Sequence, residues 1–163
     1  MFHTVFDNSI RISTNQPSIN NTTLSSSALL LSYIIFSLRR SKMPTFYDLD
    51  PKKPFRQQLE EETGTVVFTN TFTIPEGKID EALATWKRTA EILKYCPGFI
   101  STQMHQGVDS HILINVSVWE SAHHLRDGLN REDFKAVAES FPQGTQCRAH
   151  LFRRLHVEGI CAA

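Results

Sequence analysis

Cysteine is scarce in this chain. Its 163 residues include three, Cys96, Cys147 and Cys161, and no two of them have a Cys-x-x-Cys spacing. An odd number at irregular spacing argues against a disulfide framework and against a cysteine zinc site. The thiols are therefore typical of a reducing compartment, where cysteines are buried or unreactive. We expect a cytoplasmic protein, or a mitochondrial one if residues 1–42 act as a transit peptide.

An excess of one charge sign is also missing. Lys plus Arg and Asp plus Glu number 17 each, so the formal net charge is zero. This balance gives no electrostatic reason to expect nucleic acid or an anionic membrane as a partner. The hydrophobic fraction of 40% and the charged fraction of 21% are those of an ordinary globular protein.

The N-terminal region has little acidic charge and no long apolar run. Residues 1–42 contain 17 Ser, Thr or Asn and a single acidic residue, Asp7. The apolar run at 28–38 has 11 residues, whereas a membrane-spanning helix needs about 20, so we expect no stable membrane insertion. We expect 1–42 to be disordered or targeting-like, either as a transit peptide or as an extension upstream of a natural start at Met43.

What the chain does contain is an alternation of strand and helix patterns over residues 64–157. β-Branched and aromatic runs bounded by turn residues predict strands, and apolar residues at helical spacing predict helices. The predicted strands are 65–74, 99–106, 111–119 and 147–157, and the predicted helices are 79–95, 122–129 and 131–141. Residues 43–63 form an arm with one or two helical turns, Ser121 caps the second helix, and 158–163 form a tail.

This order of elements predicts an α+β, ferredoxin-like β-α-β-β-α-β fold with a four-stranded antiparallel sheet and its helices on one face. The third strand is apolar on both sides, with Leu113 on one and Ile112, Ile114, Val116 and Val118 on the other. Helices can cover only one face, so the other needs a second cover. A second copy of the chain is the simplest cover, which predicts a homodimer.

A polar stripe runs along the same strand. Side chains alternate across a strand, so Asn115, Ser117 and Trp119 share one face. Either this stripe faces water or structural partners, or it lines a cavity. A buried amide requires hydrogen-bond partners, and Asn70, on the apolar face of the first strand, raises the same question.

The stretches VVFTNTFTIPEGK, PGFIS, NVSVWES and REDFKA occur in this order, and together with the Trp86 helix they resemble the antibiotic biosynthesis monooxygenase family over about residues 64–157. The resemblance implies a dimeric α+β barrel fold. It also implies oxidation of an electron-rich, polyketide-like phenol or quinol by O2, with no metal, haem or flavin.

Family site residues can be carried over at matching positions. An Asn and a Trp four apart, with a His ten positions before the Asn, match Asn115, Trp119 and His105, which the resemblance implies are catalytic. The family Tyr six positions after the Trp is replaced by Leu125. A family Arg has its nearest counterpart in Lys135 or Arg131.

The haem-degrading branch of the superfamily is a second comparison. Its Asn and Trp match Asn70 and Trp119, but its iron-ligating His falls at Ala138, where no side chain could ligate iron.

The expected substrate site is an aromatic cavity. Its walls would be Phe68, Phe72, Trp86, Trp119 and Leu125, with Asn70 as a second hydrogen-bond donor. The alternative is a non-catalytic ligand-binding or stress-associated dimeric barrel, in which the stripe and both Trp are structural and His105 is solvated. The replacement at Leu125 favours this alternative.

Overall fold

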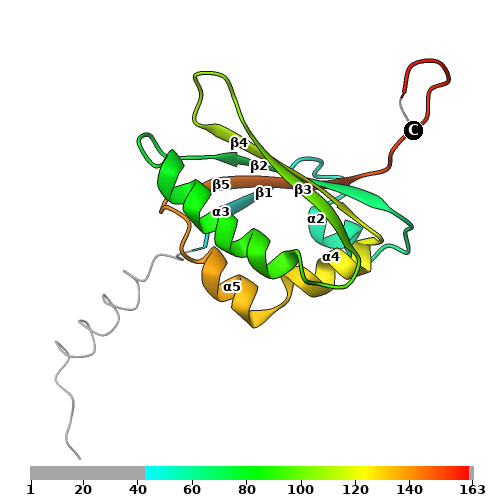
Figure 1. Cartoon of the computed structure of the whole chain (residues 1–163), viewed down its shortest axis with the longest axis horizontal. Helices are drawn as coiled ribbons and strands as arrows, with labels where there is room; N and C mark the ends of the chain where they lie inside the picture. Colours follow the sequence, from blue (N-terminus) through cyan, green and yellow to red (C-terminus); the bar gives the residue numbers. More distant parts are fainter. Residues whose placement is uncertain (1–42, 162–163) are drawn as a thin grey trace, which may run out of the picture. The chain divides into compact units, whose positions relative to one another are not determined.

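The computed structural model describes residues 43–161 (Figure 1). The expectations for residues 1–42, and for the end of the tail, lie outside this part of the chain. The elements are β1 (Thr45–Asp48), α2 (Phe55–Gln58), β2 (Val66–Thr73), α3 (Ile79–Leu93), β3 (Phe99–Gln106), β4 (Ile112–Trp119), α4 (Ala122–Leu129), α5 (Glu132–Ala138) and β5 (Gln146–Phe152). None of the helices within 43–161 has the length and apolar composition that a membrane span requires.

The predicted α+β ferredoxin-like fold is confirmed, with one correction to the sheet. The sheet has five strands in the order β1-β5-β2-β4-β3, and β1 pairs in parallel with β5, so it is mixed and not a four-stranded antiparallel sheet. The added strand is the short segment TFYD, whose four residues are all exposed. A strand without alternating burial gives no periodic signal, and it forms here because β5 offers a free edge.

The helices α3, α4 and α5 gather on one face of the sheet (Figure 1). Burial alternates along β2 and β4, as expected for strands with one covered face. The helix-facing core falls into two clusters. One surrounds Trp119 and Phe68, and the other surrounds Phe72 and Leu113. Asn70 and Asn115 lie between them along the strands, so the apolar core is interrupted by an amide pair.

Most predicted boundaries agree with the structure to within a few residues. Ser121 caps α4 as predicted, because its hydroxyl oxygen accepts a hydrogen bond from the backbone N–H of His124 at 3.2 Å. The last strand is shorter than predicted, since β5 ends at Phe152 and residues 153–157 are exposed and form no regular secondary structure. No neighbouring strand among the described residues pairs with this stretch, so its alternating sequence adds nothing to the sheet.

The other face of the sheet is open in the single chain. Ile112 and Ile114 of β4 are 37% and 39% exposed, and Phe152 of β5 is 43% exposed. These apolar side chains belong to the face that the sequence marks as needing a second cover. The homodimer remains a prediction at this point.

A glycine pair tests how tightly the turn before β3 packs against α4. Gly77 and Gly98 both have positive φ, at 68° and 75°, but only Gly98 is crowded: an added Cβ would overlap Cβ and Cγ of His124. We expect Gly77→Ala to cost about 1 kcal/mol through the left-handed conformation alone. We expect Gly98→Ala to cost about 3 kcal/mol or more, because the clash adds to that term.

The measurement is urea unfolding of both variants beside the wild type. Equal losses of stability would show that α4 moves freely away from the turn.

Candidate functional site

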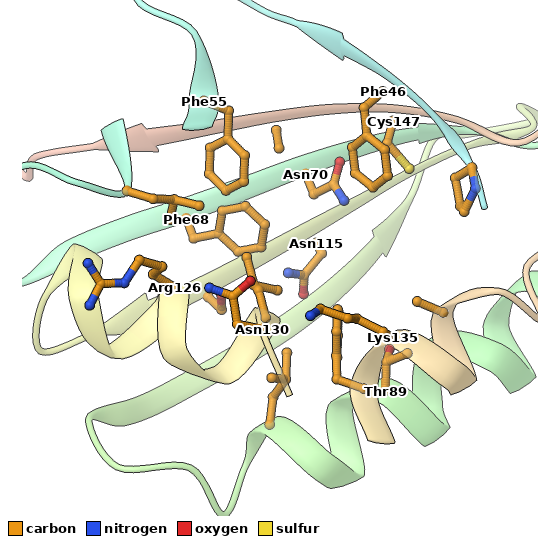
Figure 2. A pocket seen from close by; sticks show the side chains of 18 of the residues that line it. Phe46, Phe55, Phe68, Asn70, Thr89, Asn115, Arg126, Asn130, Lys135 and Cys147 are labelled. Carbon is orange, nitrogen blue, oxygen red and sulfur yellow. The ribbon is translucent and has the colours of Figure 1, made fainter. Parts of the chain in front are cut away.

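A cavity of about 890 Å³ lies between the covered face of the sheet, the helices and the N-terminal arm (Figure 2). Its walls are mainly aromatic and aliphatic, which suits a flat apolar ligand. The aromatic lining residues are Phe46, Tyr47, Phe55, Phe68, Phe72, Trp86, Phe99, Trp119, Phe134 and Phe141. Six of the eight site residues that the sequence suggested line this cavity, namely Phe68, Asn70, Phe72, Trp86, Asn115 and Trp119.

Asn115 lies in the centre of the sheet wall. Its carbonyl oxygen Oδ1 accepts a hydrogen bond from the hydroxyl of Thr102, on β3, at 2.7 Å. This contact fixes the amide plane, and among the described residues no group accepts from Nδ2. Asn115 is 7% exposed, so its free N–H groups are held in a largely dehydrated site. A donor in such a place interacts strongly with any ligand oxygen that reaches it.

Asn70 is the direct neighbour of Asn115 across the β2–β4 pairing. Figure 2 shows the two amides projecting from adjacent strands. Asn70 is 8% exposed, and its Oδ1 is buried with no hydrogen-bond partner among residues 43–161. An unpaired buried carbonyl costs about 1–3 kcal/mol, and such groups are rare outside functional sites.

Cys147 of β5 lies beside Asn70 in the same wall (Figure 2). Burial raises the pKa of its thiol to about 12, and a hydrogen bond from the Asn70 side chain opposes this shift only in part. The thiol therefore stays protonated at neutral pH. It contributes volume and a weak donor to the cavity, not a nucleophile.

Trp119 is a wall residue with no free donor. Its indole Nε1–H donates to the hydroxyl of Ser117 at 3.0 Å, and the side chain is 0% exposed. Phe99 packs against it edge to face, with ring centroids 5.3 Å apart. These contacts explain the polar stripe: Ser117 pairs with the indole, and Thr102 pairs with Asn115.

Two residues suggested by the sequence lie elsewhere, and both expectations are corrected. His105 pairs with Ile114 in the β3–β4 register, so it points to the open face of the sheet, is exposed and does not line the cavity. The ten-residue spacing to Asn115 does not bring the two side chains together, because the register places Met104 opposite Asn115. Leu125 is fully buried in the core around Trp119 and does not reach the cavity.

Three cationic side chains line the cavity, Arg56 of α2, Arg126 of α4 and Lys135 of α5. Arg131 lies outside it and binds Asp133, and this guanidinium lowers the pKa of the Asp133 carboxyl. Arg126 donates to Glu60 of the arm at 2.9 Å. The sequence did not single out Arg126, because its role depends on an ion pair with a residue 66 positions away.

The N-terminal arm closes one side of the cavity, which the sequence did not suggest. Phe55 stacks on Phe68 with centroids 5.4 Å apart and an interplanar angle of 25°. Gln58 holds the arm to β5, because its Oε1 accepts from the Leu151 N–H at 2.8 Å while its Nε2 donates to the Lys53 carbonyl. Nε2 of Gln58 also lies 2.9 Å from Nδ1 of His150. An amide NH2 group can only donate, so Nδ1 of His150 is the acceptor and the imidazole proton is on Nε2 of His150.

Metal-ligating side chains are scattered over residues 43–161. No three His, Cys, Asp or Glu side chains there lie close enough together to hold a metal ion. Ala138, at the position of the iron-ligating His of the haem-degrading branch, is buried and lines the cavity.

Comparison with protein families gives one match. Residues 65–140 match the family model described as antibiotic biosynthesis monooxygenase. Comparison with curated proteins finds no match.

Solved structures share the fold. SnoaB, a cofactor-independent oxygenase from Streptomyces nogalater, matches with a TM-score of 0.54 and 23% identity, over 60% of this chain and 99% of that chain. A proposed monooxygenase from Shewanella loihica PV-4 matches with a TM-score of 0.51 and 25% identity, over 60% of this chain and 100% of that one.

The three cysteines give a direct test of this wall. In the native protein we expect dithionitrobenzoate at pH 8 to label Cys161 rapidly, because it is exposed, and to leave Cys96 and Cys147 unmodified, because they are buried. In denaturant all three should react, and Cys161→Ser should remove the fast phase. Rapid labelling of Cys147 in the native protein would contradict this expectation. It would mean that the thiol is open to solvent and that its pKa is not raised by burial.

Proposed function

Because the chain carries a domain of the antibiotic biosynthesis monooxygenase family over residues 65–140, we propose that it oxidises an electron-rich aromatic phenol or quinol with O2 and without a cofactor. The observation that supports this most directly is the amide pair. Asn70 and Asn115 stand side by side in a cavity whose other walls are largely aromatic. The description of SnoaB as a cofactor-independent oxygenase is the precedent for the missing cofactor.

The chemistry requires an anion. Ground-state O2 is a triplet and reacts slowly with closed-shell molecules, but a phenolate or carbanion can donate one electron to it. For an anthrone the balanced reaction converts a ring CH2 group and O2 into a ring C=O group and water. The carbanion and O2 form a carbon-bound peroxide, and loss of water from this peroxide leaves the ketone. The substrate supplies all the electrons, so no further reductant is needed.

The two amides stabilise the anion of the substrate. Two N–H donors in a dehydrated cavity stabilise negative charge on a substrate oxygen far better than they would in water. Asn115 is the stronger candidate, because Thr102 already occupies its carbonyl and leaves Nδ2 for the ligand. Asn70 is the second donor.

The aromatic residues position the ring. Phe68, Phe72, Trp86 and Trp119 enclose a flat ligand and exclude water, which strengthens the amide contacts. His105 and Leu125 take no part in this proposal, since neither lines the cavity.

A non-catalytic ligand-binding protein is the second candidate. Leu125 replaces the Tyr that the family resemblance implies and is sealed in the core, and the Trp119 N–H is used internally by Ser117. A cavity with these features binds aromatic ligands but has fewer groups for proton transfer.

Oxygen uptake separates the two candidates. With 1,8-dihydroxyanthrone and a panel of hydroquinones, metal-free protein should consume O2 faster than the uncatalysed reaction. Asn115→Ala should lower kcat/KM by about 100-fold or more, and Asn70→Ala by about tenfold, because each removes a donor to the developing oxyanion.

Gln143→Ala, which removes an exposed amide outside the cavity, is the matched control and should leave uptake unchanged. Binding of the anthraquinone product without any O2 uptake would support the ligand-binding candidate.

We also propose that the chain forms a homodimer through the open face of the sheet. Exposed Ile112, Ile114 and Phe152 make this face apolar, and burying it against a second copy removes the cost of its hydration. Both named family neighbours match over nearly their whole length, so this sheet is common to them.

A charge placed on this face should break the dimer. We expect the wild type to sediment at twice the chain mass and Ile114→Lys to sediment as a monomer, because a Lys would be buried without a partner. Val108→Lys, at a hairpin tip that is 93% exposed, is the control and should remain dimeric. A wild-type monomer would contradict the proposal.

A further inference from the structure

One row of residues crosses the whole sheet on its covered face. Strand register places Asp48 opposite Ala149, Ala149 opposite Asn70, and Asn70 opposite Asn115. Met104 completes the row on β3. The row therefore carries a carboxylate at one edge of the cavity and two amides at its centre, with the small Ala149 between them.

Asp48 belongs to the N-terminal arm and lines the cavity. Its Oδ1 accepts a hydrogen bond from the backbone N–H of Phe55 at 2.9 Å, which fixes the carboxylate while leaving the other oxygen available. Glu60 also lines the cavity, but it is held by Arg126. Among the described residues, Asp48 is the cavity carboxylate that forms no ion pair.

The spacing along the row matches a ring held at both ends. Neighbouring strands lie about 4.8 Å apart, so Asp48 and Asn70 are separated by about 10 Å of sheet. An aromatic ring with an oxygen on one side and a reacting carbon on the opposite side, plus a contact of about 3 Å at each end, spans a similar length. An oxygen bound by the amides would thus place the opposite carbon near Asp48.

We infer that Asp48 is a catalytic residue, the general base that removes the proton from this carbon. The inference rests on the proposed function. The C–H bond breaks, its proton passes to the free oxygen of Asp48, and its electron pair stays on the ring and delocalises onto the oxygen held by Asn70 and Asn115. After O2 adds to the carbon, the protonated carboxyl returns its proton to the distal peroxide oxygen, which regenerates Asp48. The remaining C–H bond of this carbon then breaks and its electron pair forms the second C–O bond. The O–O bond cleaves at the same time, and the distal oxygen leaves as hydroxide, which takes the released proton and becomes water.

This assignment supplies a general base to the cavity, which His105 cannot do because it lies on the open face of the sheet. It also locates the base in the arm, before the residues 65–140 that match the family model. The parallel pairing of β1 with β5 would then serve to bring the carboxylate into the row.

Hydrogen exchange tests the proton transfer without O2. Under anaerobic conditions in D2O, the full chain should accelerate deuterium incorporation at the CH2 group of 1,8-dihydroxyanthrone, followed by NMR. Asp48→Asn should lower this acceleration by about 100-fold, because an amide still accepts from Phe55 but cannot take a proton. Formate should restore exchange in Asp48→Ala, since it can occupy the vacated space and act as the base.

Asp50→Asn is the matched control and should exchange like the wild type, because Asp50 is exposed, accepts from the Lys52 N–H and does not line the cavity. Quenching of Trp86 and Trp119 fluorescence by 1,8-dihydroxyanthraquinone should show that Asp48→Asn still binds the ring system.

Exchange in Asp48→Asn as fast as in the wild type, or no acceleration by the wild type, would overturn the assignment. Exchange that depends on Asp48 without O2 uptake in air would overturn the oxygenase proposal and leave the base in place. O2 uptake that is unchanged in Asp48→Asn would overturn the assignment of the base and leave the oxygenase proposal in place.

Discussion

The pairing of Asn70 with Asn115 across β2 and β4 is the constraint on which the site depends. Strand register is fixed wherever one face is buried, because a one-residue slip would turn every core side chain to the other side. Here Phe68 and Phe72 on one strand and Leu113 and Trp119 on the other hold the register from both ends. The amides are thereby kept in the core, at positions where the carbonyl of Asn70 has no partner among residues 43–161. The apolar clusters stabilise an arrangement that the amides alone would not adopt.

The covered and open faces of the sheet divide the chemistry from the assembly. Residues that alternate toward the helices build the cavity, and residues that alternate away from them leave an apolar surface on the same strands. His105 shows how strict this division is. It lies one position from Met104, which faces the cavity side, and that single step places its imidazole on the opposite face.

The N-terminal arm forms one wall of the cavity. It is fastened to β5 by strand pairing and by Gln58, to Phe68 by the stacked ring of Phe55, and to α4 by the Glu60–Arg126 ion pair. The ion pair is partly exposed and contributes little stability by itself, so the buried Gln58 contacts and the aromatic stack carry most of the attachment. A short segment with no periodic pattern of its own thus supplies polar and aromatic groups to the cavity.

The sequence by itself determined the elements that have a period. Alternation in the segments around Phe68 and Asn115 predicted strands with a covered face, helical spacing around Trp86 predicted α3, and Ser121 marked the start of α4, because these signals are local. The tertiary structure alone decided the rest. Whether His105 meets Asn115 depends on register, whether Leu125 reaches the cavity depends on how α4 packs, and β1 exists only because β5 has a free edge. These outcomes follow from contacts between residues far apart in the chain, which no local pattern contains.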